Sequence, residues 1–555
     1  MPTYRNMMLL APSYLRELLG KAFAHIDVPA EHAVVLEGSI AEGFGNDASD
    51  IDYLVITPGD RIQPTMPTIL FIDGRRVEVR MRSAEQIRAQ LDTLRTTAAR
   101  DVGRVSDDLL NRCQRFVNCY PLVNEPFIER LREPLPPAEL QDITARWFEH
   151  QTRPAYGFAA AMRLLGEPRY AELAERTALA RAAKSWLSRQ GETYLDFKWL
   201  SPQFARAPGG AEVAAEYGEL IAGTPSPQAV GGFLTRLGLG ADARLDRLEL
   251  RRRRGVTTWQ LGSRVHVVRG RAEIFALSDR AARVWRSLPF GVPLERALAQ
   301  GPGVTGPLIA FFHRLGLVEL RWRGGPVLPG CGSHTPTPAT VLPLLALDGL
   351  LLVDGDRGTD VTGDVALAPT PARRFAACGM ALIWGNLGVE NAREDLVGAI
   401  GLDQEGTATA ASLRMVRSAC QSVIAAYGVD PQPPIEEAPL VVARMPHVDP
   451  AVAARAVELS AFLLRHGFGA LPGGIGELDE FTLLVRRATR CEFPSTFVSA
   501  EGWGSTLDIG YDWVRLGAYL DSAFPVEEAR DLLASGGAQP ATRAEGAPAA
   551  AGSAR

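Results

Sequence analysis

The dipeptide Asp73-Gly74 joins two short strand-like runs, Thr68–Ile72 and Arg75–Met81. Asp-Gly between such runs is a strong signal for a tight β-hairpin, because glycine and aspartate tolerate the positive φ that the turn requires. Upstream, the chain shows in order a helical periodicity, an apolar run, a short helix and a second apolar run, at 11–25, 33–36, 39–43 and 51–56. We therefore expect residues 1–90 to form a small domain with a mixed sheet.

The hydrophobic period changes repeatedly after residue 90, which indicates several domains. Long helical stretches such as 171–190 predict a helical region, and strand-like runs around helices at 262–323 predict a winged-helix outline. A length of 555 residues leaves room for three or four cores. The sequence thus predicts an α+β multidomain protein, with a mixed-sheet domain at 1–90, a helical domain at 91–245, a winged-helix-like domain at 255–323, a mostly helical domain at 341–535 and a disordered tail at 536–555.

Composition argues against several classes of partner. The formal net charge of −5 provides no overall field that would attract nucleic acid or a membrane, so any polyanion site must be local. The basic run Arg251–Arg254 has no interleaved aromatic residues and is interpreted as a solvated cluster. Six cysteines show no zinc-ligand spacing, and no apolar run reaches the ~18 residues of a spanning helix. We expect a cytoplasmic protein with no membrane or nucleic-acid partner.

Three acidic residues carry the chemical signal. Asp50 and Asp52 stand at positions i and i+2 of the second apolar run, so both carboxylates point to one face of a strand. Glu78, on the hairpin, can complete the cluster, and Arg76 and Arg80 share its strand face. Clustered carboxylates repel one another unless cations neutralise them, and hard oxygen ligands suit Mg²⁺ or Mn²⁺. The pattern predicts that the three acids are catalytic and ligate metal.

A Gly-Ser pair precedes the first of these acids by eleven residues. Gly38 allows the backbone to approach a phosphate chain closely, and Ser39 offers a hydroxyl near a helix start. Ser49 is a second candidate to donate to phosphate. Together these three residues predict the phosphate-binding part of a nucleoside triphosphate site.

Gly38-Ser39, the strand Ser49–Val55 and the hairpin acid Glu78 resemble the active site of the DNA polymerase β-type nucleotidyltransferase superfamily over residues 10–90. A small catalytic domain followed by helices is similar to the aminoglycoside-type and minimal antitoxin-type members. The resemblance implies metal-dependent transfer of a nucleoside monophosphate, with ATP as the expected donor, to a hydroxyl or phosphate. In such proteins basic residues of the second domain commonly reach the triphosphate, which by position implies Lys198, Arg181 and Lys184.

A second resemblance covers residues 262–323, above all Glu273–Trp285 and Phe312–Val318. This segment is similar to the pyrroloquinoline quinone peptide chaperone, a domain that binds leader peptides of ribosomally made, modified peptides. An extended peptide can add to an exposed edge strand of such a domain. The resemblance implies a precursor peptide as partner. The alternatives are an ordinary winged helix and one that reads DNA, although Glu273 and Asp279 among the arginines weaken the latter.

Three functional hypotheses follow. The first is a nucleotidyltransferase that modifies an acceptor, with a precursor peptide recruited by the 255–323 domain. The second keeps the chemistry but places the acceptor group on a small molecule such as an aminoglycoside, which leaves the last 200 residues without a role. The third is a peptide-binding scaffold whose first domain senses nucleotide, and the intact acidic triad weighs against it because sensing needs no third acid.

Overall fold

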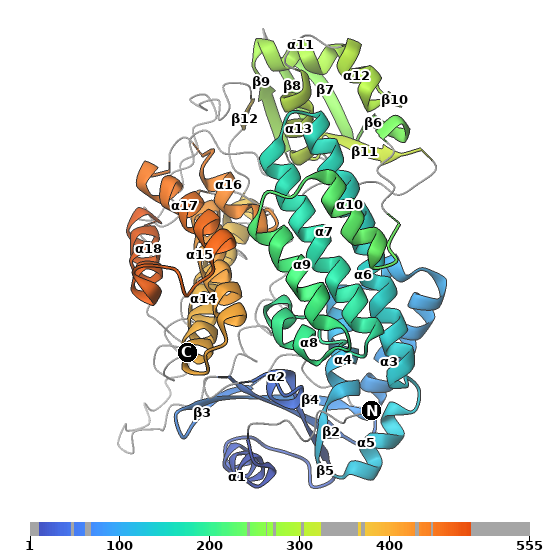
Figure 1. Cartoon of the computed structure of the whole chain (residues 1–555), viewed down its shortest axis with the longest axis vertical. Coiled ribbons are helices and arrows are strands. Elements are labelled where there is room, and N and C mark those ends of the chain that lie inside the picture. Colours follow the sequence, from blue (N-terminus) through green and yellow to red (C-terminus); the bar gives the residue numbers. More distant parts are fainter. Residues whose placement is uncertain are drawn as a thin grey trace, which may run out of the picture.

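The structure is a computed structural model, and it describes residues 10–45, 49–60, 68–240, 245–261, 264–269, 273–300, 305–323, 365–367, 372–427, 432–445 and 448–489. Helices and small sheets alternate along these residues, which confirms the predicted α+β class (Figure 1). The predicted tail at 536–555 lies outside them. Within these ranges no helix has the length and apolarity needed to cross a membrane.

The N-terminal sheet has the strand order β3-β4-β2-β1-β5. β2 and β4 run parallel, and the other neighbouring pairs are antiparallel. The hairpin prediction is confirmed, with φ of 52° at Asp73 and 75° at Gly74. The elements of this region are α1 (Pro12–Phe23), β1 (Ala33–Glu37), α2 (Gly38–Ala41), β2 (Ile51–Thr57), β3 (Thr68–Ile72), β4 (Arg75–Ser83), α3 (Ala84–Arg100), α4 (Asp107–Asn118), β5 (Tyr120–Val123) and α5 (Glu125–Arg132).

The sheet extends past the boundary predicted at residue 90, because β5 pairs with β1. β5 has four residues, one of them a proline, and two helices separate it from β4. Such a run shows no alternation in the sequence. An edge position tolerates its proline, since the outer side of an edge strand needs no hydrogen-bond donor.

Successive side chains of β2 point to opposite faces of the sheet, so they pack in two different cores. Tyr53 and Val55 pack against α1, and the Tyr53 hydroxyl donates to the carbonyl of Leu15 over 2.6 Å. Leu54 packs on the other face, in a core built mainly with α3, α4 and α6. Asp52 lies on the same face as Leu54, near the start of the strand. The acidic residues therefore lie on the face opposite α1.

The second region is helical, as predicted. It consists of α6 (Pro137–Leu164), α7 (Pro168–Arg189), a short 3-10 turn (Phe197–Trp199), α8 (Leu200–Arg206), α9 (Gly210–Ala222) and α10 (Pro227–Arg236). α6 and α7 pack along each other, and α4 of the first region packs on α6. The helical region therefore packs directly against the sheet domain.

The third region has the predicted strands and helices, but it begins before residue 255. Its elements are β6 (Leu248–Arg252), β7 (Val256–Leu261), β8 (Arg264–Arg269), β9 (Glu273–Leu277), α11 (Asp279–Ser287), β10 (Val292–Pro293), α12 (Leu294–Gln300), α13 (Thr305–Arg314) and β11 (Val318–Trp322). β6 pairs with β11, and the core includes Phe158 and Tyr170 of α6 and α7. The region shares its core with the helical region. β12 (Val365–Leu367) pairs with β9, so part of this chain occupies that edge.

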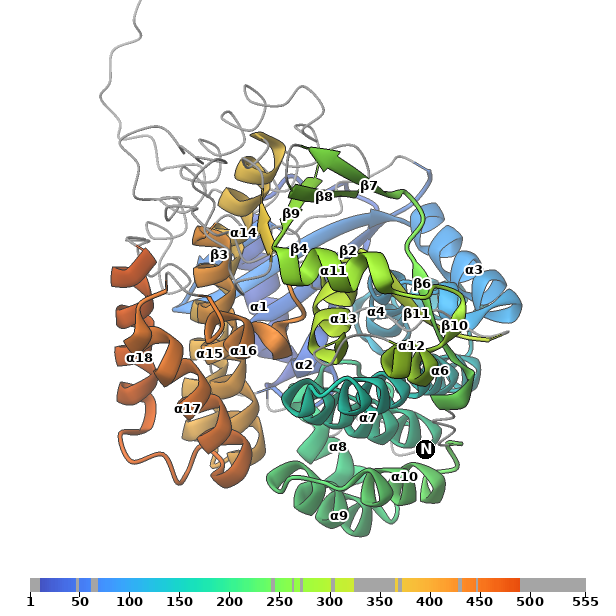
Figure 2. The same ribbon diagram turned by 90° about the horizontal axis from the view of Figure 1, so that it is seen from above.

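The last region is helical within its described part. It consists of α14 (Ala372–Gly401), α15 (Glu405–Ala426), α16 (Ala438–Val442), α17 (Pro450–His466) and α18 (Gly474–Thr489). The remainder of the predicted 341–535 domain, apart from β12, lies outside the described residues. Its core takes in Ile69 of β3, and α15 and α17 contact α8 and α9. Figure 2 shows these helices and α7–α10 on opposite sides of the view, with the N-terminal sheet behind and between them.

Candidate metal and nucleotide site

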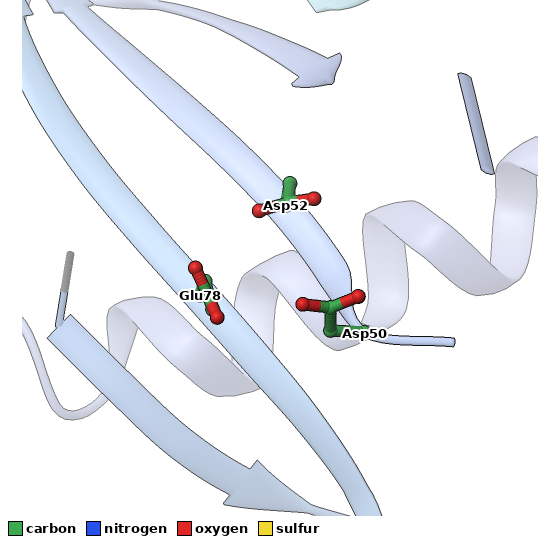
Figure 3. A group of neighbouring side chains, drawn as sticks. All are labelled: Asp50, Asp52 and Glu78. Atoms are coloured by element: carbon green, nitrogen blue, oxygen red, sulfur yellow. The ribbon is translucent and has the colours of Figure 1, made fainter. Parts of the chain in front are cut away.

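Asp50, Asp52 and Glu78 converge on one face of the sheet. Asp52 lies on β2 directly opposite Glu78 on the parallel strand β4, and Asp50 immediately precedes β2 (Figure 3). Each residue offers a carboxylate oxygen, and these oxygens all lie within 4.8 Å of one another. This spacing fits a shared divalent cation, because hard cations prefer carboxylate oxygen ligands. The structure thus brings together the three acids that the sequence selected.

Gly38 stands next to this cluster for a steric reason. Its φ is +76°, and a Cβ at this position would lie 2.2 Å from Oδ2 of Asp52. Any larger residue would therefore displace the carboxylate as well as strain the backbone. Ser39 and Ser49 are both buried. The Gly-Ser corner consequently sits beside the acids, as the sequence predicted, and the position of Asp52 depends on the glycine.

Three arginines surround the acids. Arg76 pairs with Asp50 over 2.9 Å and lies 3.7 Å from Glu78. Arg80 contacts Glu78 over 3.0 Å, and Arg115 contacts Asp52 over 2.8 Å. The side chain of Arg76 is 7% exposed, so these are poorly solvated ion pairs. Each of the three carboxylates thus has a guanidinium partner within 4 Å in the metal-free protein.

The protonation of the three acids differs because their surroundings differ. Burial alone would raise the pKa of Asp50, but the charges of Arg76 and Lys198 hold it below its ordinary value. Burial raises the pKa of Asp52 despite Arg115. Burial and the two neighbouring aspartates raise the pKa of Glu78 to about 7. Without a metal, the site therefore keeps Asp50 ionised and holds Glu78 near the midpoint of its titration at neutral pH.

Helix α14 brings two further acids to this site from the last region. Glu394 accepts a hydrogen bond of 3.0 Å from Arg76, the same guanidinium that binds Asp50. Its neighbour Asp395 accepts two bonds of 2.8 Å from Nζ of Lys198. Burial raises the pKa of Glu394 to about 7, against the charge of Arg76. The site thus lies between the N-terminal sheet and α14.

The three predicted basic residues have different placements. Lys198 lies near the acids: burial works against its charge, but Asp395 and Asp196 hold the pKa of Lys198 above its ordinary value. Arg181 lies on the wall of a cavity behind Lys198 and donates to the carbonyl of Gln151.

Lys184 requires a correction. Its side chain is fully buried, and Nζ donates to the carbonyls of Tyr194 and Asp196 and to the side chain of Gln203. All three donors of the ammonium are used. The prediction that Lys184 binds phosphate conflicts with this placement. The resemblance implied Lys184 by its position in the sequence, and position alone does not show how deeply a side chain is buried.

Sequence reasoning missed Arg115, Glu394 and Asp395. No local pattern marks Arg115, which reaches the acids because α4 crosses the end of β1. No local pattern marks Glu394 and Asp395 either, because the surrounding segment of α14 also contains Glu390, Asn391 and Arg393.

Comparison with protein families and curated proteins identifies no relative of this chain. No protein-family model matches the chain, and no curated protein matches it.

Proposed function

We propose that this protein is a metal-dependent nucleotidyltransferase that transfers a nucleoside monophosphate, with ATP as donor, to an acceptor hydroxyl or phosphate. The observation that carries the proposal is the convergence of Asp50, Asp52 and Glu78 beside a glycine whose lack of a side chain leaves room for Asp52. These three acids would hold Mg²⁺ or Mn²⁺. The bound cation would supply charge stabilisation at the α-phosphate and at the departing pyrophosphate.

The reaction requires an oxygen of the acceptor to attack the α-phosphorus. The new bond joins that oxygen to phosphorus, the bond from phosphorus to the bridging oxygen of the β-phosphate breaks, and pyrophosphate leaves. For a hydroxyl acceptor the proton passes to a carboxylate, and we assign this role to Glu78. The Gly38-Ser39 corner orients the phosphates through its backbone and hydroxyl.

The arginines have a second task in this proposal. In the metal-free protein they neutralise the acids, and a cation that binds the acids would take over that role. Arg76 and Arg80 then become available for the phosphate oxygens, for which the guanidinium group is well suited. The exchange keeps the local charge near balance during binding.

The test is nucleotide-dependent pyrophosphate release with candidate acceptors, followed by mass measurement of the product. A mass increase equal to one nucleoside monophosphate, dependent on Mg²⁺ or Mn²⁺, would support the proposal. Full activity of the Asp50→Asn, Asp52→Asn double variant would remove the enzymatic assignment from this site and favour a nucleotide-sensing scaffold.

Recruitment of a precursor peptide is a second, subsidiary proposal, and one observation favours it. β12 adds to the edge strand β9 with the register Val365↔Leu277, Ala366↔Ala276 and Leu367↔Phe275. The edge therefore accepts an extended segment, but the chain itself fills it. A peptide must displace β12 or use the other edge, β7.

The strand-addition test uses a synthetic peptide that copies residues 361–371. Proline removes a ladder donor, and donors alternate along a strand, so Ala366→Pro and the Val365→Pro, Leu367→Pro pair between them cover both phases. We expect one of these full-length variants to bind the peptide more tightly than the unmodified chain. Equal binding by all three proteins would exclude an exchangeable strand at β9.

A further inference from the structure

A cavity of about 540 Å³ lies between the helical region and the last region. Its walls come from α7, the turn Phe197–Trp199 and α9 on one side, and from α15 and the segment before α16 on the other. A second cavity of about 570 Å³ adjoins it and shares Arg176, Arg417 and Glu436 with it. Neither cavity includes the acidic triad, and neither has a role in the transfer steps described above.

The charges on this cavity are unbalanced. Five basic and two acidic side chains line it, namely Arg176, Arg181, Lys198, Arg414, Arg417, Asp196 and Glu436. Three of the basic groups have close acidic partners: Arg176 pairs with Glu172, and Lys198 and Arg414 both face Asp395. The surplus of positive charge therefore rests on the remaining two arginines.

Arg181 and Arg417 are the under-neutralised pair. Arg181 makes one hydrogen bond of 3.3 Å, to the carbonyl of Gln151. No ion pair or hydrogen bond joins Arg417 to another described residue, although Glu436 supplies some compensating charge. Burial lowers the pKa of both guanidinium groups. Both side chains are partly buried and line the cavity, so a bound anion would supply the close partner that they lack.

The rest of the wall is apolar and aromatic. Phe197 is 41% exposed, which is unusual for a large apolar side chain, and it lines the cavity. Tyr217 of α9 also lines the cavity, near Arg176 and Arg417, and aliphatic side chains of α7 and α15 complete the lining. An aromatic wall next to two cations suits a ligand with a planar or apolar body and an anionic group.

Lys198 connects this cavity to the acidic triad. The side chain lines the cavity, pairs with Asp395 over 2.8 Å and contributes to the lowered pKa of Asp50. Asp395 is adjacent in sequence to Glu394, which binds Arg76 beside Asp50. The cavity is thus connected to the acidic triad through Lys198 and α14. The cavity has the placement expected of an acceptor site.

We propose that this cavity binds the acceptor of the transfer reaction, and that the acceptor carries a phosphate or carboxylate group on a planar or apolar body. This inference rests on the proposed function. It also argues against an aminoglycoside-like acceptor, because a polycationic molecule would meet five basic side chains and two acidic ones.

The first experiment measures ligand binding to the full chain by calorimetry in EDTA. The probes are phenyl phosphate and, as a cation of similar shape, phenyltrimethylammonium. We expect phenyl phosphate to bind and the cation not to bind. Because charge-assisted hydrogen bonds are lost, Arg417→Gln and Arg181→Gln should each weaken the association roughly tenfold. Glu436→Gln should strengthen it several-fold, since it removes an opposing charge without removing a cation.

Arg88→Gln is the matched control, because Arg88 is an exposed arginine of α3 outside the cavity. It should leave binding unchanged. Equal affinity of the unmodified, Arg417→Gln and Arg181→Gln proteins would overturn the inference. Opposite shifts for Arg417→Gln and Glu436→Gln cannot arise from a general loss of folding, so the test does not depend on the stability of one variant.

A second arm separates acceptor from nucleotide. The titration is repeated with saturating Mg²⁺ and α,β-methylene-ATP, and we expect phenyl phosphate affinity to stay within about twofold. Competition between the two would show that the cavity holds the phosphates of the nucleotide, which overturns the acceptor assignment. If the analogue does not bind at all while phenyl phosphate does, the nucleotidyltransferase proposal fails and the anion site stands.

Discussion

The acidic triad and the cavity lined by Arg181 and Arg417 differ in how their charged side chains are paired. In the triad, Arg76, Arg80 and Arg115 neutralise the three carboxylates within 4 Å. In the cavity, Arg417 has no such partner and shares one carboxylate, Glu436, with Arg181. Each acid of the triad has a guanidinium partner without a ligand, whereas Arg417 has no such partner among the described residues. This difference predicts that a cation would enter the triad by exchange with a guanidinium group, while an anion would add to the cavity without displacing a partner.

The largest expected effect is on catalysis at the triad. Asp50→Asn or Asp52→Asn should lower turnover by ~10² or more, because each removes charge that stabilises the transition state. Pyrophosphate release at saturating Mg²⁺ measures it. The amide keeps the shape of the carboxylate, so far-UV circular dichroism should be unchanged. Wild-type turnover in both variants would show that the balanced acids are structural.

Removal of one arginine that contacts the triad should destabilise the fold. Arg115→Met leaves Asp52 and Glu37 buried without their nearest cation, and breaking a buried pair costs about 3 kcal/mol or more. Urea unfolding of the metal-free protein measures this loss. Added Mg²⁺ should recover part of it if the ion replaces the guanidinium charge. A variant as stable as the parent protein would contradict the view that this region is balanced by its arginines.

Glu42 is a buried carboxylate outside both the triad and the cavity. It accepts hydrogen bonds of 2.5 and 2.8 Å from the side-chain amides of Gln114 and Asn118. Burial raises its pKa from 4.5 to about 7. The folded state therefore binds the proton more tightly, so the stability from this group is fully present below about pH 4.5 and is lost as the pH rises through 7.

Glu42→Gln should remove that loss. The variant should be more stable than the parent at pH 8 by roughly 1–3 kcal/mol and nearly equal at pH 4.5. Because both proteins contain the other acids with raised pKa values, the contribution of those acids to the pH dependence cancels in the difference. Glu85→Gln, at an exposed position on α3, serves as control. A stability difference that does not vary with pH would show that Glu42 is not a titrating group in this range.

The last prediction compares the stability change at Arg417 with that at Arg115, and the change at Arg417 should be small. Arg417→Met should change the free energy of unfolding by less than about 1 kcal/mol, with stabilisation the favoured direction, because it removes a charge that has no close partner. The same arginine-to-methionine change at Arg115 is its counterpart. Similar losses at both positions in urea unfolding would mean that Arg417 is neutralised in the folded protein.

Local patterns predicted the first domain well. The strand at β2 and the Asp-Gly turn depend on neighbours in sequence or on one hairpin, and the structure reproduces them. The same reasoning missed β5, which is too short to show a period. Strand periodicity places Asp50 and Asp52 on one face, and the structure brings Glu78 of β4 beside them. The metal-binding role of the three acids stays a prediction.

Prediction failed where depth or a distant contact decides the outcome. Lys184 and Arg181 look equivalent in a helical pattern, yet one is enclosed by carbonyl groups and the other lines a cavity. Glu394 reaches Arg76 across a sequence separation of 318 residues. No periodicity encodes which face of α14 meets β4, because that choice follows from the packing of two whole regions.

That separation has a consequence for the newly made chain. Arg76 is synthesised 318 residues before Glu394, and at typical elongation rates of about 5–20 residues per second the interval is roughly 15–60 s. The sheet and its acids have time to fold in that interval, but the wall formed by α14 does not yet exist. A chain still on the ribosome therefore carries the acidic triad for that interval without the α14 groups that enclose it in the finished fold.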